Sequence, residues 1–194
     1  PIYILRGHDP AYLAQLDRKT PDDGWSMLDA DTYLSPGSLT AARHAVGGIC
    51  AAVDAVLAGE DGNAFLAMRP PGHHAERARA MGFCIFSTVA LGALRALDHH
   101  GLDRVAVLDF DVHHGNGTQD VLWDDKRAMF ASSHQSPLYP GTGATSETGV
   151  GNIVNGVVGP HAPRERWRKV FESLIDRLDA FAPDMPREPA ASLA

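Results

Sequence analysis

Apolar residues recur at three- and four-residue steps in three stretches of the chain, and this spacing predicts three amphipathic helices. The first is expected to start at Ser38, a suitable N-cap residue, and to stop at Gly59. The second runs from Ser87 to Gly101, and the third covers residues 164–181. The apolar positions of these helices are Leu39, Ala42, Val46, Ile49, Val53 and Val56, then Val89, Leu91, Leu94 and Leu97, then Trp167, Val170, Leu174, Leu178 and Phe181.

Short apolar runs between these helices predict strands at residues 64–68, 104–110, 128–132 and 152–158, with a further short helix near residues 118–123. Strands that alternate with helices favour a parallel sheet with helices on both faces, which is an α/β fold. No internal repeat or interdomain linker interrupts the pattern, so a single domain is expected.

Composition narrows the functional class. A chain of 194 residues with 44% hydrophobic and 21% charged residues is an ordinary globular domain. A net charge of −7 argues against direct nucleic-acid binding and is compatible with a cationic substrate. Cys50 and Cys84 have neither metal-binding nor redox spacing, which indicates a reducing compartment, and no apolar stretch could span a bilayer. The cytoplasm is therefore the expected location, and an oligomer is possible.

Candidate chemistry follows the strand expected at residues 104–110. Side chains alternate along a strand, so Asp109, Asp111 and His113 project to one side if the extended conformation continues. Placing two carboxylates and an imidazole together costs free energy unless they are paired with one another or bind a cation. A carboxylate and an imidazole at the carboxyl end of a parallel strand suit a divalent metal such as zinc.

A second cluster, Arg69-Pro70-Pro71-Gly72-His73-His74, follows the strand expected at residues 64–68. The prolines stiffen this loop, and adjacent histidines do not readily share one direction. Each imidazole is therefore expected to meet its own partner, with Asp109 a candidate for one of them. A carboxylate behind an imidazole fixes its tautomer and raises its basicity, as a general acid or base requires.

Three ordered segments carry a family resemblance. RPPGHHAERARAMGFC (residues 69–84), VLDFDVHHGNGTQ (107–119) and SSHQSPLYPGTG (132–143) resemble the histone deacetylase superfamily, most of all its class II members and bacterial deacetylase-like amidohydrolases. The resemblance runs from about His8 to Asp184 and implies the three-layer arginase/deacetylase α/β fold. It also implies a zinc-dependent amidohydrolase that removes acetyl or other acyl groups from an acetyl-lysine peptide or from a small acetylated amine such as a polyamine.

The resemblance assigns the catalytic and metal-binding roles. Asp111 and His113 would bind zinc. His74 would be the general base and acid, and His73, backed by Asp109, its electrostatic partner.

The resemblance also assigns the residues around this centre. Asn116 would stand behind His74, which should then be less basic than with an aspartate in that place. Gly82 and Phe83 would border a narrow acyl-lysine tunnel, with Tyr139 near the opposite wall and Asp31 at the rim. A structural potassium ion would be held by the carboxylate of Asp109, the carbonyls of Asp111 and His113, and Ser132.

The same resemblance implies that the chain is incomplete at both ends. Residues 1–184 would form a partial deacetylase-like catalytic domain, and residues 185–194 a divergent, disordered tail. The family's third metal-binding aspartate and catalytic tyrosine have no counterpart here, so the chain alone is expected to be inactive or weakly active. If it does hold zinc fully, His134 and Glu147 are the first candidates for a third ligand.

Three alternatives stay open. The chain could be a catalytically dead remnant of this fold. It could also be a two-metal ureohydrolase, although the DxHxD ligand pattern of that class is not matched because position 115 is Gly115. Finally, Phe83 and Tyr139 could be ordinary core aromatics without a role in a tunnel.

Overall fold

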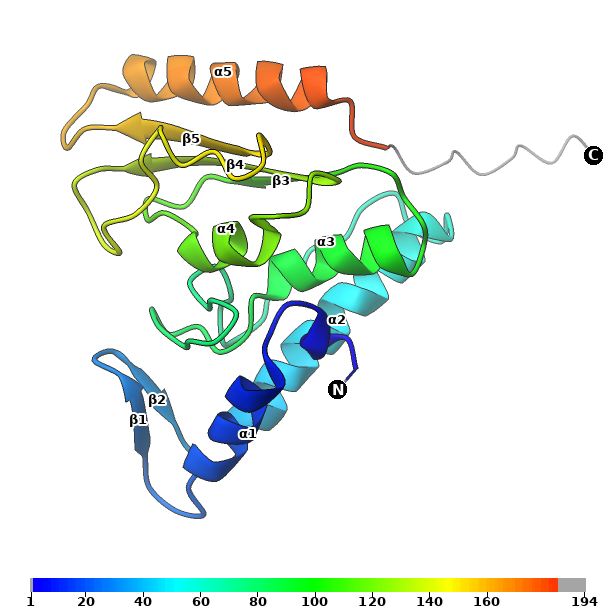
Figure 1. The fold of residues 1–194 in the computed structure, drawn as a ribbon, viewed down its shortest axis with the longest axis vertical. Coiled ribbons are helices and arrows are strands. Elements are labelled where there is room, and N and C mark those ends of the chain that lie inside the picture. Colours follow the sequence, from blue (N-terminus) through cyan, green and yellow to red (C-terminus); the bar gives the residue numbers. More distant parts are fainter. Residues whose placement is uncertain (1, 185–194) are drawn as a thin grey trace, which may run out of the picture.

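The computed structural model describes residues 2–184 of the chain. Three parallel strands, β3 (Val105–Asp109), β4 (Ala128–Gln135) and β5 (Ile153–Val158), form the main sheet in the order β3-β4-β5. Helix α5 (Arg164–Phe181) covers one face, and α3 (Thr88–Asp98) and α4 (Asn116–Leu122) lie against the other (Figure 1). The layered α/β fold with helices on both faces of a parallel sheet is thereby confirmed.

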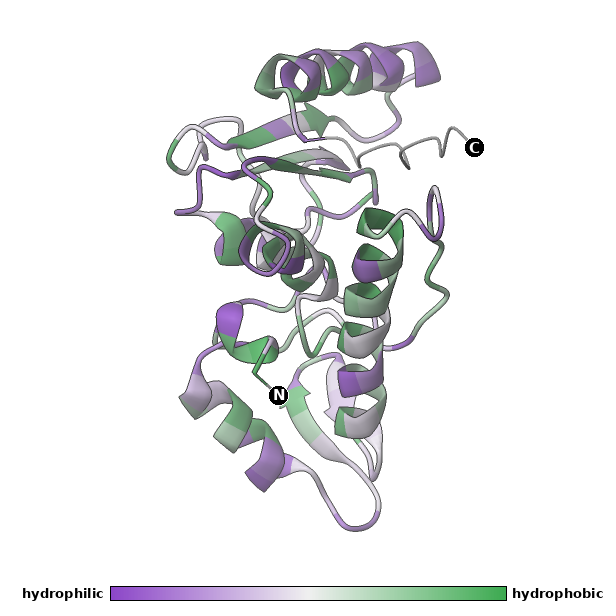
Figure 2. Ribbon diagram, turned by 90° about the vertical axis from the view of Figure 1, so that its right-hand side faces the viewer, coloured by the Kyte–Doolittle hydropathy of each residue, from purple (hydrophilic) through white to green (hydrophobic). Residues whose placement is uncertain are grey.

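Side-chain alternation explains why the sheet has two apolar faces. Val105 and Val107 of β3 pack with α3 and α4, whereas Ala106 and Leu108 pack with α5. The sheet is therefore apolar on both sides, and α5 is apolar only along the stripe that faces it (Figure 2). The stripe of α5 includes Leu174 and Leu178, which are both buried as the spacing predicted.

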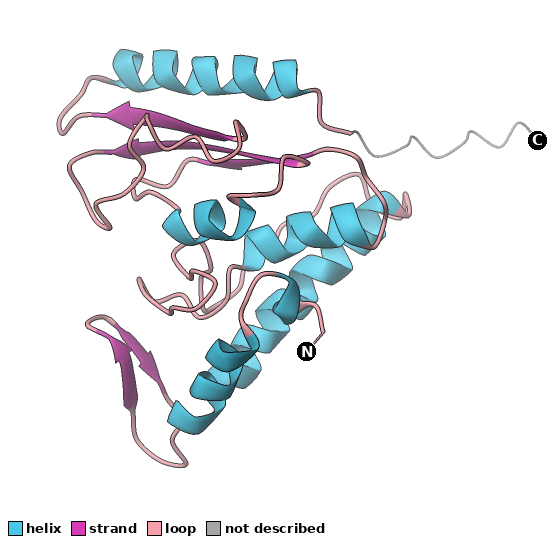
Figure 3. Ribbon diagram, viewed as in Figure 1, coloured by secondary structure: helices cyan, strands magenta, loops and turns pink. Residues whose placement is uncertain are grey.

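The N-terminal part of the chain forms a second core beside α3. It contains a short 3-10 helix, η1 (Ile4–Arg6), followed by α1 (Pro10–Lys19) and α2 (Ser38–Leu57). A separate antiparallel hairpin, β1 (Ser26–Asp29) and β2 (Thr32–Leu34), stands apart from the main sheet (Figure 3). Its inner side chains join those of α1 and α2 in one cluster, which includes Tyr12, Leu16, Leu34, Leu39, Val46 and Phe86.

The expected helices are present with small shifts at their caps. Gly37, at φ +88°, is the N-cap residue of α2, and the hydroxyl of Ser38 accepts a hydrogen bond from the Ser35 amide instead of capping. Gly59 follows the end of α2 at φ +75°, as the C′ position requires. Ser87 precedes α3, but its hydroxyl makes no capping bond.

One predicted strand needs correction, and one prediction concerns residues outside the described part of the chain. The strand expected at residues 64–68 is wrong, since this segment is a loop in which Phe65 is 92% exposed. A strand needs a neighbour for its backbone hydrogen bonds, and β3 pairs with β4 alone within residues 2–184. The tail predicted at residues 185–194 lies outside the described residues. None of the described helices is long and apolar enough to cross a bilayer.

Candidate active site

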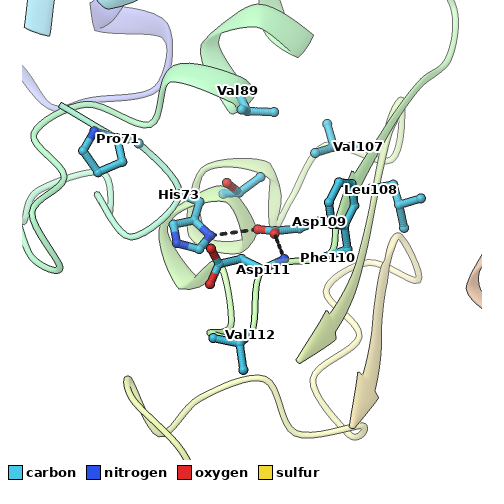
Figure 4. A pocket seen from close by; sticks show the side chains of 11 residues that line it. Pro71, His73, Val89, Val107, Leu108, Asp109, Phe110, Asp111 and Val112 are labelled. Atoms are coloured by element: carbon cyan, nitrogen blue, oxygen red, sulfur yellow. Dashed lines mark hydrogen bonds and ion pairs between the residues drawn. The ribbon is translucent and has the colours of Figure 1, made fainter. Parts of the chain in front are cut away.

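The candidate site lies at the carboxyl end of β3, where the loop of residues 69–74 approaches the strand. A cavity of about 600 Å³ opens beside Pro71, His73 and the second half of β3 (Figure 4). The extended conformation of β3 ends at Asp109, and the chain then bends. The sequence-based expectation that Asp111 and His113 continue the strand is therefore wrong. Backbone amides stabilise the bends, because Asp111 N donates to Asp109 Oδ1 and His113 N donates to Asp111 Oδ1.

His73 and Asp109 form the first imidazole pair. His73 Nδ1 lies 2.9 Å from Asp109 Oδ2, and the imidazole must donate because a carboxylate only accepts. Burial works against the charged forms of both groups, but their mutual hydrogen bond and attraction outweigh it. The pKa of His73 is therefore raised and that of Asp109 lowered. A side chain at position 115 would collide with Asp109, so Gly115 permits this close approach.

His74 and Asn116 form the second pair. His74 Nδ1 lies 2.8 Å from Asn116 Oδ1, while the Asn116 amide nitrogen donates to Glu76 Oε1 at 2.7 Å. Since the asparagine presents its oxygen to the ring, His74 carries its proton on Nδ1 and leaves Nε2 free to accept one. Burial, followed by the nearby charge of His73, lowers the pKa of His74, although the hydrogen bond with Asn116 opposes the shift.

The first turn of α4 fixes the distance between these pairs. The amides of Gly117 and Thr118 both donate to the His73 carbonyl, at 2.8 and 3.1 Å. A side chain at position 117 would run into the backbone of Ala75, so glycine lets α4 approach the loop directly. The two imidazole rings consequently lie 4.0 Å apart, centre to centre, each with its own oxygen partner.

Asp111 and His113 are the candidate zinc ligands. Asp111 Oδ1 lies 3.2 Å from His113 Nδ1, and the two side chains are 49% and 40% exposed. Carboxylate oxygen and imidazole nitrogen are donors that zinc accepts. Within residues 2–184, however, no three His, Cys, Asp or Glu side chains gather in a way that could hold a metal ion. The described residues therefore supply two of the three protein ligands that a catalytic zinc site usually has.

Gly82 and Phe83 lie beside His74 on a strained bend. Both residues have positive φ angles, +56° and +65°, and a side chain at position 82 would collide with the His74 ring. The β1–β2 hairpin holds the bend, because Gly82 N donates to Asp31 Oδ1 and Phe83 N donates to Thr32 Oγ1. Phe83 is 62% exposed, so the alternative of a core aromatic is wrong for it.

Tyr139 reaches the same place from the loop after β4. Its ring meets His74 edge-on with centres 5.1 Å apart, and it lies 6.1 Å from His113. Burial, assisted by the charges of Asp31 and Asp29, raises the pKa of Tyr139 to about 12, so its hydroxyl stays neutral. Tyr139 is 39% exposed and therefore is not a core aromatic either.

Other polar side chains behind the site make hydrogen bonds to groups other than Asp111 and His113. Ser132 is the register partner of Asp109 and donates to His134 Nδ1, while His134 Nε2 donates to the Gly143 carbonyl. Glu147 accepts from Gln119 and from backbone amides. His134 and Glu147 thus form no metal-holding group with Asp111 and His113 in the described chain.

Sequence reasoning missed Glu76, which orients the Asn116 amide, and the hairpin that supports Gly82 and Phe83. Glu76 lies between His74 and Arg77 with no periodicity to single it out. The weak sign of the hairpin was the Asp-Ala-Asp-Thr segment at residues 29–32, which contains both supporting side chains.

Two adjacent histidines with separate oxygen partners lie at the carboxyl end of a parallel α/β sheet, which is the arrangement that the family resemblance predicted. The comparisons with known proteins agree. A profile described as "Histone deacetylase domain" matches residues 3–185, and the chain belongs to that family.

Relatives and a solved structure support this membership. A probable deacetylase of Methanothermobacter thermautotrophicus is 41% identical over 84% of this chain and 50% of its own length. The histone deacetylase-like amidohydrolase of Pseudomonas aeruginosa is 44% identical over 71% of this chain and 36% of its own length. The acetylpolyamine aminohydrolase of Burkholderia pseudomallei has the same fold, with a TM-score of 0.85, 28% identity, and coverage of 94% of this chain and 64% of that one.

The chain spans about half the length of the curated relatives it matches. Neither the family profile nor the relatives named above support the ureohydrolase alternative.

Proposed function

We propose that this chain carries the acid–base half of a zinc-dependent deacetylase centre that acts on acetyl-lysine or acetylated small amines. The observation that carries the proposal is the pair of imidazoles 4.0 Å apart, one on a carboxylate and one on an amide oxygen, beside Asp111 and His113. Bound by Asp111, His113 and a third donor, zinc would supply a Lewis acid that polarises an amide carbonyl and lowers the pKa of water.

The two histidines have different tasks in this proposal. His74 is neutral, and its Nδ1–H donates a hydrogen bond to Asn116 Oδ1. Its Nε2 takes a proton from the attacking water and returns it to the departing amine. His73, whose pKa is raised beside Asp109, places positive charge next to His74 and keeps that ring neutral until it receives the proton.

The substrate would enter between the exposed rings of Phe83 and Tyr139. Tyr139 meets the His74 ring edge-on, and Phe83 follows Gly82, which lies against that ring. Apolar walls accept a neutral acylated amine more readily than a charged lysine, which must stay hydrated. Behind this site, the Asp109 carboxylate, the carbonyls of Asp111 and His113, and Ser132 would hold the structural potassium ion. In support, Asp109 and Ser132 are register partners on adjacent strands.

The test uses a hybrid chain in which this sequence replaces the matching part of the Methanothermobacter relative, so that the remaining half of a family member is present. With zinc, the hybrid should release acetate from an acetyl-lysine peptide or an acetylated polyamine. His74→Ala should lower turnover by roughly 10²–10⁴, the usual contribution of a general base, without loss of zinc. The exposed His44 gives the matched control, and a His74→Ala rate equal to that of His44→Ala would refute the assignment.

A further inference from the structure

The loop between β4 and β5 carries Tyr139 near its start and Glu147 near its end. Residues 136–147 contain neither helix nor strand, and the loop's own backbone restrains Tyr139 only through a turn in which Gly141 N donates to the Leu138 carbonyl at 2.9 Å. Yet the Tyr139 ring lies at a defined edge-on position against His74 and His113. Contacts of the loop with the rest of the domain must therefore fix that position.

Glu147 joins the middle of this loop to α4 through its side chain. Its Oε1 accepts from the amides of Gly143 and Ala144, at 3.2 and 3.0 Å, and its Oε2 accepts from Gln119 Nε2 at 2.6 Å. Every one of these partners is an N–H group, and a carboxylate only accepts. Partial burial opposes the charge of Glu147, but these hydrogen bonds outweigh it and lower its pKa.

Gln119 extends the network into the core. Because its amide nitrogen faces Glu147, its Oε1 accepts from His114 Nε2 at 3.0 Å and from Asn155 Nδ2 at 2.8 Å. His114 then accepts from Thr142 Oγ1 through Nδ1, at 2.8 Å. Each donor thus has an acceptor, and the network joins the loop to α4 and to the segment that carries His113.

Gly143 is the point where the loop touches this network most closely. Its φ is +86°, and a side chain there would collide with the rings of both His114 and His134. Those rings lie 4.7 Å apart, and His134 Nε2 donates to the Gly143 carbonyl at 3.0 Å. The middle of the loop is therefore fixed on both its amide and its carbonyl side, four residues after Tyr139.

We infer that Glu147 is a positioning residue, which acts through Gln119 and the amides of residues 143 and 144 to hold Tyr139 against His74 and His113. The inference deepens the proposed function, since it rests on Tyr139 being a wall for the acylated amine. It assigns to Glu147 no contact with substrate. The position of Tyr139 can be measured without any turnover, so the two proposals fail separately.

The experiment places 3-fluorotyrosine at the four tyrosines of this chain and records fluorine NMR spectra, with Tyr139→Phe to assign the Tyr139 signal. In Glu147→Gln, the new NH₂ group faces either the Gln119 amide nitrogen or the two backbone amides, so one donor meets another. The Tyr139 signal should then move toward that of free fluorotyrosine, while the buried Tyr12 signal stays in place. Glu172→Gln, on the exposed face of α5, is the matched control and should move neither.

Rescue separates this role from a general loss of structure. In the double variant Glu147→Gln and Gln119→Glu, the amide at 147 donates to the carboxylate at 119, which still accepts from His114 and Asn155. The Tyr139 signal should return to its original position. An unmoved Tyr139 signal in Glu147→Gln would overturn the inference. So would failure of the double variant to restore it, including the case in which Glu147→Gln unfolds the chain and all four signals collapse.

Acetate release decides the proposed function independently. The assay uses the hybrid chain, and a displaced and rescued Tyr139 signal together with an inactive hybrid would remove the substrate role and leave the positioning role. An active protein whose Tyr139 signal ignores Glu147→Gln would remove the positioning role alone.

Discussion

His8 is buried without charge in the N-terminal core. Only 2% of the residue is exposed, and its ring packs against Tyr12 and Phe86 at 5.4 Å. Its Nε2 accepts from the Ser87 amide at 2.9 Å, so protonation there would break a hydrogen bond as well as bury a charge. Burial lowers the pKa of His8 from 6.5 to about 4, although the Arg77 carbonyl bonded to Nδ1 opposes the shift.

This shift predicts how stability depends on pH. Below pH 6.5 the unfolded chain binds a proton at His8 and the folded chain does not, so the free energy of unfolding falls as the pH drops from 6.5 to about 4. The loss should total about 3 kcal/mol, since each pKa unit is worth about 1.4 kcal/mol. Urea unfolding across this range should show a flatter pH dependence in His8→Gln than in the exposed-site control His44→Gln. Equal slopes in the two variants would contradict the prediction.

At the level of residues, the sequence predicted side chains that belong to a motif and missed those that support it. Adjacent histidines were expected to find separate partners because their side chains diverge, and the structure pairs His73 with Asp109 and His74 with Asn116. Glu76 and Glu147 could not be predicted in the same way. Each is an isolated acidic residue in a loop, and its partners become neighbours only once the chain has folded.

Among the elements, the junction of α4, β4 and β5 depends on Asn152. Its buried amide nitrogen donates to the carbonyls of Leu122, Asp125 and Ala128, at 2.8, 3.0 and 2.9 Å. These carbonyls belong to the end of α4, the following turn and the first residue of β4. The side chain of Asn152, just before β5, thus links three consecutive backbone segments that are not paired as strands with one another.

Asn152→Ala would remove the donor that these three carbonyls share, although those of Leu122 and Asp125 also accept from the backbone amides of Asp125 and Ala128. We expect a loss of about 1–3 kcal/mol in the free energy of unfolding, the usual cost of leaving a buried polar group without its partner. Urea unfolding measures it as a lower midpoint with an unchanged m-value. Asn63→Ala, at an exposed loop position, should cost less than about 0.5 kcal/mol. Similar midpoints for the two variants would show that the junction is held by other contacts.

Elements with strong periodicity were predictable, and those that depend on distant contacts were not. Helix α5 was predicted at residues 164–181 and is found there, since its apolar stripe alone determines the buried face. The β1–β2 hairpin has only four and three residues in its strands and is supported by contacts of Asp31 and Thr32 with residues 82 and 83. Residues 64–68 have the composition of a strand, but composition cannot supply the neighbour that a strand requires.

At the scale of the whole molecule, the free edge of β3 is the dominant feature. Along residues 2–184 this strand pairs on one side only, with β4. Cavities of about 600 and 460 Å³ open beside its two halves, the second lined mainly by apolar side chains of α2 and of residues 62–66. Asp184 N donates to the Arg104 carbonyl at 2.9 Å, which brings the described chain back to the start of this edge. Such an edge is a template for a further strand.

The number of donors within residues 2–184 limits how the proposed metal centre can bind zinc. Asp111 and His113 are two donors, and a catalytic zinc site usually takes three from the protein. We therefore expect the isolated chain to bind zinc at least roughly 100-fold more weakly than the hybrid chain described above, since loss of even an outer-shell partner costs about 10–100-fold in affinity. It should also release little acetate.

Competition with a chromophoric chelator measures both zinc affinities. In the hybrid, Asp111→Asn and His113→Ala should each weaken binding by a similar factor, whereas Asp124→Asn, at an exposed carboxylate after α4, should leave it unchanged. Equal zinc affinity of the isolated chain and the hybrid would mean that the chain supplies a third ligand itself. Full zinc occupancy in both Asp111→Asn and His113→Ala would instead remove these two residues from the metal site, and the centre would have to be sought away from the carboxyl end of β3.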